Sequence, residues 1–363
     1  MTSKIEFKES ETVLSYLKEN SDRLPFKTKV RDVKRLLGGY ANYVFRLWFE
    51  DRTTAVFKYY GPQMAFMESL ESSQFRFHIE KTILGVFGSA ECLKQCMVQA
   101  PKLLFYEDAL HYLIMEDCGE TSCTLTDLMR QSFKLSSESE NEDEKEKKRR
   151  IDTYLTNLAR GIQEFTYKIS HECGLTPDSH GQMFKNEAYW AVINGIFSSN
   201  IRRAAQELDV EKEFAPYYDH KQEQPSVAYF VQGDFWTNAI MVNVETNRAW
   251  VLDWETARFD TEYRDLQELG FILWVMRKNP SIIDIERLNH FERQLQLAYF
   301  GDENADWRSR TGADTRLNFI HMLVLSYAFK DNVEMDIKLA DFKASTRQAL
   351  DELNEFGAKC TSF

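Results

Sequence analysis

The chain has no run of apolar residues long enough to cross a lipid bilayer. Its longest strongly apolar stretch is Leu269–Met276, whereas a transmembrane helix needs about 20 such residues. The first eight residues, MTSKIEFK, contain no apolar core of the kind found in signal peptides. We therefore expect neither a membrane partner nor secretion, and the sequence predicts a cytoplasmic protein.

Cysteine and histidine pairs with metal-binding spacing are also missing. The six cysteines include no CxxC pair and the seven histidines include no HExxH pair, which argues against the common zinc sites. We expect reduced thiols in a reducing compartment. Cys360 begins a C-terminal tetrapeptide with the outline of a prenylation signal, but its middle residues are polar and no polybasic run precedes it.

Positive charge is in the minority. The chain carries 45 Lys and Arg against 57 Asp and Glu, a formal net charge of −12. Because such a protein repels phosphate backbones and anionic lipids, neither nucleic acid nor membrane is expected as a main partner. An acidic surface would suit a cationic or amine-bearing substrate. The 363 residues, with 43% hydrophobic and 28% charged residues, are typical of a globular protein large enough for two domains.

The pattern of apolar residues changes near Gly119, from strands to helices. Before this point, period-two and helical patterns predict five strands and two helices. The strands are expected at 33–37, 43–49, 53–60, 102–106 and 109–115, and the helices at 10–20 and 66–87. After it, helices are expected at 125–133, 151–171, 187–208, 264–277, 282–300, 313–332 and 338–357. A hairpin is predicted at 239–244 and 249–252, and a solvated loop at 136–150, which has no apolar residue.

Two acidic centres flank that predicted hairpin. Asp234 lies in VQGDFWTNAIMV, residues 231–242, and Asp253 lies in WVLDWE, residues 250–255. Phosphoryl transfer needs two such carboxylates, because one must orient and deprotonate the attacking hydroxyl and another must hold the Mg²⁺ that bridges the phosphates. Taken alone, each residue would more often be an ordinary turn carboxylate.

The combination of GDFWTN, an apolar hairpin and LDWE resembles the catalytic core of the aminoglycoside phosphotransferase and choline-kinase-like superfamily. It looks most like eukaryotic small-molecule kinases, including the methylthioribose-kinase-like ones, and extends from about Leu36 to Gly270. The resemblance implies a two-lobed, protein-kinase-like fold of the α+β class. We expect an N-lobe at 1–117, with a five-stranded antiparallel sheet and one main helix, and a mainly helical C-lobe at 118–363.

The resemblance also implies roles for four acidic residues. Asp234 would be the catalytic base and Asp253 the metal-binding aspartate. Glu255 would lie beside the metal and the substrate. Asp265 would brace the catalytic loop by accepting hydrogen bonds from backbone N–H groups.

Two positions depart from the pattern of the superfamily. Gln232 stands where a histidine usually braces the loop, and Ala239 stands where a metal-binding asparagine is usual. A methyl group cannot bind Mg²⁺, so Asn238 is the predicted substitute. These departures leave open the alternative that the chain is a nucleotide-binding pseudokinase or scaffold.

A glycine turn in the N-terminal third is the predicted phosphate loop. Gly38, Gly39 and Asn42 lie between two predicted strands, and glycine lets backbone N–H groups approach a phosphate closely. An ordinary hairpin turn is the alternative interpretation. Similar Gly-Gly-x-x-Asn segments occur in the superfamily that this chain resembles.

The same resemblance assigns the remaining nucleotide contacts. Lys58, on the next strand, is expected to hold the α- and β-phosphates and to pair with Glu80 on the following helix, with Glu71 as the second choice. Backbone groups near Glu116 and Cys118 are expected to face adenine. The predicted reaction is transfer of the ATP γ-phosphate, with Mg²⁺, to a hydroxyl of a small molecule. Nucleotidyl transfer on the same fold is a further alternative.

Overall fold

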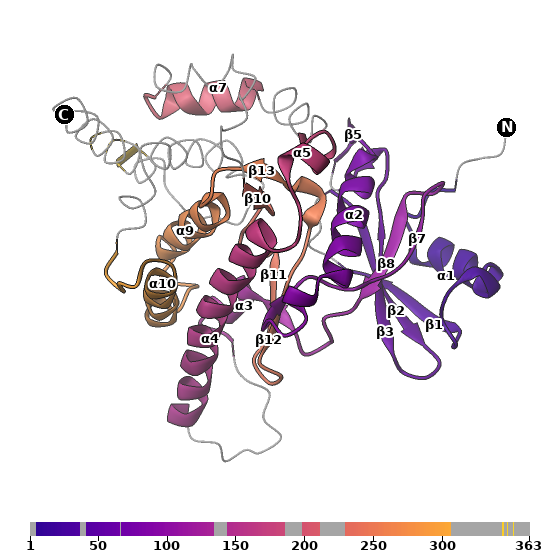
Figure 1. Ribbon diagram of the computed structural model, residues 1–363, viewed down its shortest axis with the longest axis horizontal. Coiled ribbons are helices and arrows are strands. Elements are labelled where there is room, and N and C mark those ends of the chain that lie inside the picture. Colours follow the sequence, from indigo (N-terminus) through magenta and orange to yellow (C-terminus); the bar gives the residue numbers. More distant parts are fainter. Residues whose placement is uncertain are drawn as a thin grey trace.

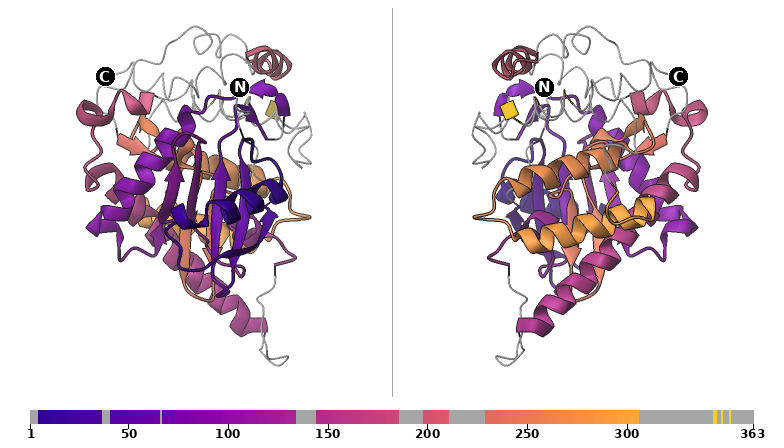
Figure 2. Two further views of the ribbon diagram at one scale, coloured as in Figure 1. Left: turned by 90° about the vertical axis from the view of Figure 1, so that its right-hand side faces the viewer. Right: turned by 90° about the vertical axis from the view of Figure 1, so that its left-hand side faces the viewer.

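The computed structural model describes residues 5–36, 41–65, 67–133, 144–185, 198–210 and 229–305, together with 343, 344, 347 and 351. Within these ranges the N-terminal sheet lies at one end of the molecule and helices α4 (Glu144–His171), α9 (Arg264–Arg277) and α10 (Ile285–Phe300) lie at the other (Figure 1). Helices α9 and α10 run side by side, away from that sheet (Figure 2).

The N-terminal sheet has the predicted five antiparallel strands, in the order β1-β2-β3-β8-β7. The strands are β1 (Val30–Arg35), β2 (Tyr43–Phe49), β3 (Thr54–Tyr59), β8 (Tyr112–Glu116) and β7 (Leu103–Glu107). Both faces of the sheet are covered. Ala55 and Phe57 of β3 pack with α1 (Ser10–Glu19) in one apolar cluster, and Val56 packs in a second cluster. Because strand side chains alternate between faces, Lys58 shares the face of Val56.

The predicted helix at 66–87 is wrong in its first part. A small hairpin of β4 (Gln63–Met64) and β5 (Met67–Glu71) occupies this region, and helix α2 begins only at Phe75 and ends at Ser89. The physical reason lies in residues 71–74, ESSQ, which offer no apolar side chain to bury and interrupt the helical pattern.

The later helices are predicted with mixed success. Helix α9 has the predicted bounds, 264–277, and α10 begins three residues later than predicted. Helix α4 begins at Glu144, inside the expected loop at 136–150, because Glu, Lys and Arg favour helix even without an apolar face. Helix α3 (Leu125–Met129), which starts with a Thr124 cap, is shorter than expected. The structure also contains α5 (Pro177–His180) and α7 (Ser198–Glu207).

Several predicted segments lie wholly or partly outside the described residues: the helix at 313–332, most of that at 338–357, the first half of that at 187–208, and the part of the charged segment from 136 to 143. The second half of the predicted helix at 187–208 is confirmed as α7.

The predicted hairpin at 239–252 is confirmed as β11 (Ile240–Asn243) and β12 (Arg248–Val251). It belongs to a four-stranded sheet with β6 (Val98–Gln99) and β9 (Cys123–Thr124). A further pair, β10 (Tyr229–Val231) with β13 (Arg258–Asp260), brings the segments before and after the hairpin together. These extra strands are too short to show a pattern in the sequence.

Helix α2 joins the N-terminal sheet to the rest of the chain. Its Phe87 packs edge to face on Trp254, with ring centroids 4.8 Å apart, and Trp254 in turn contacts Phe165 of α4. One apolar cluster therefore continues from β3 and β8 through α2 to α4 and the hairpin of β11 and β12. Trp254, which follows Asp253, is fully buried in this core and is not a substrate-facing ring.

No helix within the described ranges combines the length and the apolar character that crossing a membrane requires.

Two phenylalanines of α2 provide a test of this shared core. Phe87→Ala is expected to lower the free energy of unfolding by about 3–5 kcal/mol, because it leaves a cavity beside Trp254. The matched control is Phe75→Ala, since Phe75 is 42% exposed whereas Phe87 is 7% exposed. The control is expected to cost less than about 1 kcal/mol. Urea denaturation measures both, and equal losses would contradict the packing described here.

Candidate active site

A buried lysine joins the sheet, helix α2 and the segment that follows the hairpin of β11 and β12. Lys58 Nζ lies 2.7 Å from Glu80 Oε2 and 2.7 Å from Asp253 Oδ1, and its side chain is 1% exposed. The predicted pair of Lys58 with Glu80 is therefore confirmed as a contact. Glu71, the second choice, lies on β5 and is exposed.

The charges around Lys58 favour its protonated form. Burial alone would lower the pKa of the lysine, but the carboxylates of Asp253 and Glu80 outweigh burial and raise it. Glu80 also accepts a hydrogen bond of 2.5 Å from the Tyr60 hydroxyl. Since Lys58 is one cation facing two carboxylates, the group carries a net negative charge and would gain from a second cation.

The loop that carries Asp234 is held from both sides by side chains. Asp265, at the start of α9, accepts hydrogen bonds from the backbone N–H groups of Gln232 (2.9 Å) and Gly233 (3.0 Å). This contact confirms the predicted brace. Gly233 has φ +83°, and a Cβ atom there would lie 2.2 Å from Arg258 Nη1, so no larger residue fits.

Gln232 performs a bracing role with an amide in place of a histidine ring. Its Nε2 donates to the backbone carbonyls of Leu252 (3.0 Å) and Asp253 (2.8 Å), and its Oε1 accepts from the N–H of Asp234 (2.7 Å). The residue is fully buried. One side chain therefore ties the two acidic segments to each other.

Asp234 remains accessible to solvent within a strongly acidic environment. The residue as a whole is exposed, but protein atoms packed around its carboxyl group displace water. This desolvation, together with the carboxylates of Glu268, Asp253 and Glu255, raises the pKa of Asp234 to about 7. A carboxylate with this pKa holds a proton more readily than an ordinary aspartate, as a general base near neutral pH requires.

Asp253 keeps one carboxylate oxygen accessible. It adopts a left-handed conformation, φ 55° and ψ 58°, immediately before a 3-10 turn at Trp254–Thr256. Its side chain is 49% exposed, and only Oδ1 is hydrogen-bonded to a described residue. An accessible carboxylate oxygen is a ligand that Mg²⁺ prefers, and Mg²⁺ often binds through one or two carboxylates plus phosphate and water.

Asn238 and Ala239, which are adjacent in the chain, differ in their exposure to solvent. Ala239 is fully buried, whereas Asn238 is exposed and its side chain makes no hydrogen bond to any described residue. Among the described residues, no group of three or more acidic, His or Cys side chains is arranged to hold a metal. A metal bound here would therefore depend on Asp253, with Asn238 the predicted additional ligand.

Arg76 was not singled out from the sequence, although it is central to the site. Its Nη1 lies 3.1 Å from Glu255 Oε1 and donates to Asn42 Oδ1 at 3.0 Å, and Asn42 donates to Glu255 Oε2 at 2.5 Å. Glu255 and Asn42, predicted for metal and nucleotide, thus contact each other through a buried network. The one available signal was the spacing of Arg76 and Glu80, which places both on one face of α2.

The predicted adenine-binding segment follows β8. The N–H of Cys118 makes no hydrogen bond to another described residue, and its carbonyl accepts from the Ser122 hydroxyl at 2.5 Å. Glu116 pairs with the backbone of Lys102. The N–H of Cys118 is therefore available for a ligand. The assignment of Glu116 and Cys118 to adenine binding stays a prediction. Gly38 and Gly39 lie outside the described residues.

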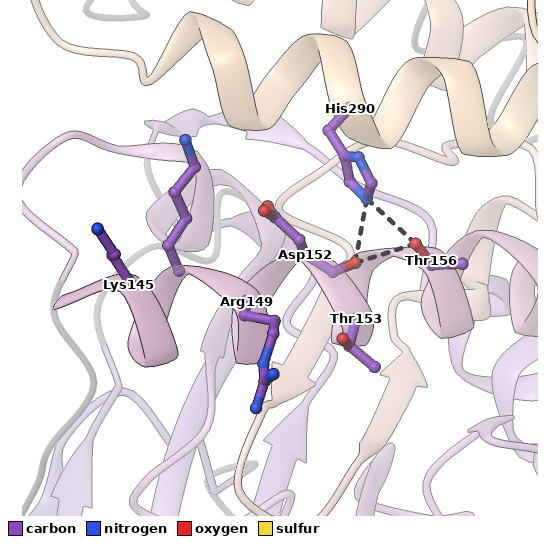
Figure 3. Close-up of a pocket in the computed structure, with 7 residues that line it drawn as sticks. Lys145, Arg149, Asp152, Thr153, Thr156 and His290 are labelled. Atoms are coloured by element: carbon purple, nitrogen blue, oxygen red, sulfur yellow. Dashed lines mark hydrogen bonds between the residues drawn. The ribbon is translucent and has the colours of Figure 1, made fainter. Parts of the chain in front are cut away.

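A surface pocket of about 380 Å³ lies at the start of α4, against α10 (Figure 3). Its basic side chains include Lys148 and Arg149, which are already paired with Glu286 and Glu146. His290 contacts the Thr156 hydroxyl and the Asp152 carbonyl. No residue predicted for catalysis lines this pocket, and nothing there indicates a phosphate-transfer site.

Comparison with known proteins agrees with this geometry at the level of fold. No family model and no curated protein matches the chain. Among solved structures, an amicoumacin kinase in complex with AMP-PNP, Ca²⁺ and Ami is similar, with a TM-score of 0.50 and 13% identity over 98% of this chain and 96% of that one. A choline kinase from Streptococcus pneumoniae also matches, at 13% identity and TM-score 0.47 over 96% and 100% of the two chains.

The chain therefore has the kinase-like α+β fold that its motifs predicted, the fold also seen in the amicoumacin kinase. At such low identity, the likeness establishes the fold and leaves the reaction to be argued from the site.

The pKa of Asp234 generates a test that needs no substrate. An unfolded aspartate has a pKa of about 3.9, so the folded protein binds more protons between that value and about 7 and loses stability as pH rises through this window. Asp234→Asn removes the effect. We expect the variant to raise the melting temperature more at pH 8 than at pH 5.

Asp22→Asn is the matched control, because Asp22 is exposed in the 3-10 turn Ser21–Arg23. It is expected to leave the melting temperature unchanged at both pH values. An Asp234→Asn effect that is equal at pH 5 and pH 8 would contradict the raised pKa.

Proposed function

We propose that this protein is an ATP-dependent phosphotransferase that moves the γ-phosphate to a hydroxyl of a small molecule. The observation that carries the proposal is the contact of Lys58 with both Glu80 and Asp253, on the face of the sheet that packs with α2. A strand lysine, a helix glutamate and a metal-binding aspartate are the components that hold nucleotide phosphates in kinase-type sites.

The nucleotide would be bound by residues of the N-terminal sheet, of the segment after β8 and of the segment that carries Asp253. Lys58 would hold phosphate oxygens, and the predicted turn at Gly38 and Gly39 would cover them. Backbone groups near Glu116 and Cys118 would meet adenine. Asp253 would hold Mg²⁺, with Asn238 beside it; when bound, the ion neutralises phosphate charge. We propose that Lys58 and Asp253 separate from each other at this stage, because each then has a stronger partner.

Asp234 would act on the acceptor. As the acceptor oxygen bonds to the γ-phosphorus, the bond between that phosphorus and the bridging oxygen of ADP breaks, and the hydroxyl proton passes to Asp234. The raised pKa of about 7 makes the carboxylate a better proton acceptor than an ordinary aspartate. The braces from Gln232 and Asp265 keep the loop in place, which is how positioning contributes to rate.

The acceptor is proposed to be a small alcohol, and cationic or amine-bearing alcohols are the first to test. The support is electrostatic: the chain has a net charge of −12, and three further carboxylates surround Asp234 closely enough to raise its pKa. A cationic acceptor would be attracted to such a site. We place the activity in the cytoplasm, where the five free cysteines among the described residues would stay reduced.

A nucleotide-binding pseudokinase is the second candidate. The observation that favours it is the complete burial of Ala239, where related proteins carry a metal-binding asparagine, because this position offers no ligand to a second metal. Binding of ATP without turnover of any acceptor would support this candidate over the kinase.

Two substitutions separate the proposed roles. Asp234→Asn is expected to reduce phosphate transfer by at least about 100-fold while leaving ATP binding within a few-fold of normal, since general base catalysis contributes about 10²–10⁴-fold to the rate.

Asp253→Asn is expected to weaken nucleotide binding in the presence of Mg²⁺ but much less in its absence.

ADP release on a panel of small alcohols measures the first effect, and calorimetric titration with and without Mg²⁺ measures the second. A near-normal rate for Asp234→Asn would rule out its assignment as the base. A product that carries AMP would show that the reaction is nucleotidyl transfer and not phosphotransfer.

A further inference from the structure

Two separate cation–carboxylate pairs hold the Asp253 segment to the N-terminal sheet and its helix. The first joins Lys58 to Asp253 and the second joins Arg76 to Glu255, two residues further along. Arg76 and Glu80 are four residues apart on α2, so both pairs converge on one face of that helix. The same short segment is therefore attached at two points.

The two pairs differ in their exposure to solvent. The Asp253 side chain is 49% exposed and keeps one oxygen without a hydrogen bond to a described residue. The side chains of Arg76 and Glu255 are 7% and 10% exposed, and both oxygens of Glu255 are engaged by Arg76 or Asn42. Because separating buried charges leaves each without compensation, the second pair is far harder to open than the first.

Asn42 extends the second pair to a third segment. It precedes β2 directly, it is 6% exposed, and its amide both donates to Glu255 and accepts from Arg76. An amide that uses both its donor and its acceptor within a buried network is fixed in orientation. The chain that follows the predicted glycine turn is thus attached to α2 and to the Asp253 segment.

We infer that Asn42, Arg76 and Glu255 form a permanent clamp that keeps the Asp253 segment in place while Lys58 and Asp253 leave each other to bind nucleotide and metal. This inference rests on the proposed function. It makes Arg76 and Glu255 positioning residues, which act through Asp253 and Asn42 rather than by ligating the metal. The predicted role of Glu255 as a metal ligand is the competing assignment.

The test is calorimetric binding of AMP-PNP with Mg²⁺, which requires no acceptor. Arg76→Gln and Glu255→Gln are each expected to weaken binding about tenfold or more, as removal of one member of a coupled network does. The double variant is expected to bind more tightly than either single variant, because it leaves no unpaired charge in the buried network. Arg23→Gln is the matched control, since Arg23 pairs with Glu107 at the surface and is 63% exposed.

The outcomes distinguish this inference from the proposed function. If the unaltered protein does not bind AMP-PNP, the proposed function fails and the clamp fails with it. If it binds, an Arg76→Gln variant with near-normal affinity overturns the clamp alone. A double variant that binds as weakly as Glu255→Gln, with the loss confined to samples containing Mg²⁺, also overturns it and makes Glu255 a metal ligand.

Melting temperatures of the same variants separate positioning from general damage. A merely structural network would lower the melting temperature of Arg76→Gln without changing the affinity of the protein that remains folded, and that result overturns the clamp. If Arg76→Gln does not fold, the double variant decides between the two assignments by the same comparison with Glu255→Gln.

Discussion

The pairing of the buried Lys58 ammonium group with two carboxylates is the interaction on which the site depends. A lysine that is 1% exposed must be compensated, because an isolated charge in a protein interior is very costly. Its compensation comes from Glu80 on α2 and Asp253 beside the catalytic hairpin, so stabilising one charge also brings three distant parts of the chain together. Alternation along β3 makes this possible, since Lys58 lies on the face that packs with α2, where it meets Asp253, while Phe57 fills the opposite core.

The structure accommodates one of the two departures noted in the sequence and provides no polar group at the position of the other. Gln232 makes three hydrogen bonds that connect the Asp234 loop to Leu252 and Asp253, so a neutral amide can replace a bracing imidazole. Ala239 has no such replacement at its own position, because its side chain is buried and apolar. A metal site here would rely on Asp253 with phosphate and water, an arrangement that Mg²⁺ accepts because it retains much of its hydration.

Local patterns predicted the elements that have strong periodicity and clear boundaries. The strands of the N-terminal sheet, the hairpin at β11 and β12, and α9 all follow from apolar spacing between polar turns. The start of α2 and the start of α4 were misplaced for opposite reasons: the first pattern included a polar stretch that forms a separate hairpin, and the second ignored charged residues that extend a solvent-facing helix. Short strands such as β10 and β13 exist only because tertiary contacts pair them.

The sequence by itself determined which residue types stand at the acidic centres, that Asp234 and Asp253 flank a hairpin, and that Lys58 lies on a strand before a helix carrying Glu80. These features are local, and a single segment of chain is enough to specify each of them. Only the tertiary structure decided which charges meet. The contact of Arg76 with Glu255 joins residues 179 positions apart, and that of Asn42 with Glu255 joins residues 213 apart. Such contacts depend on how helices and sheets pack, because burial selects partners for charges that no local pattern can pair.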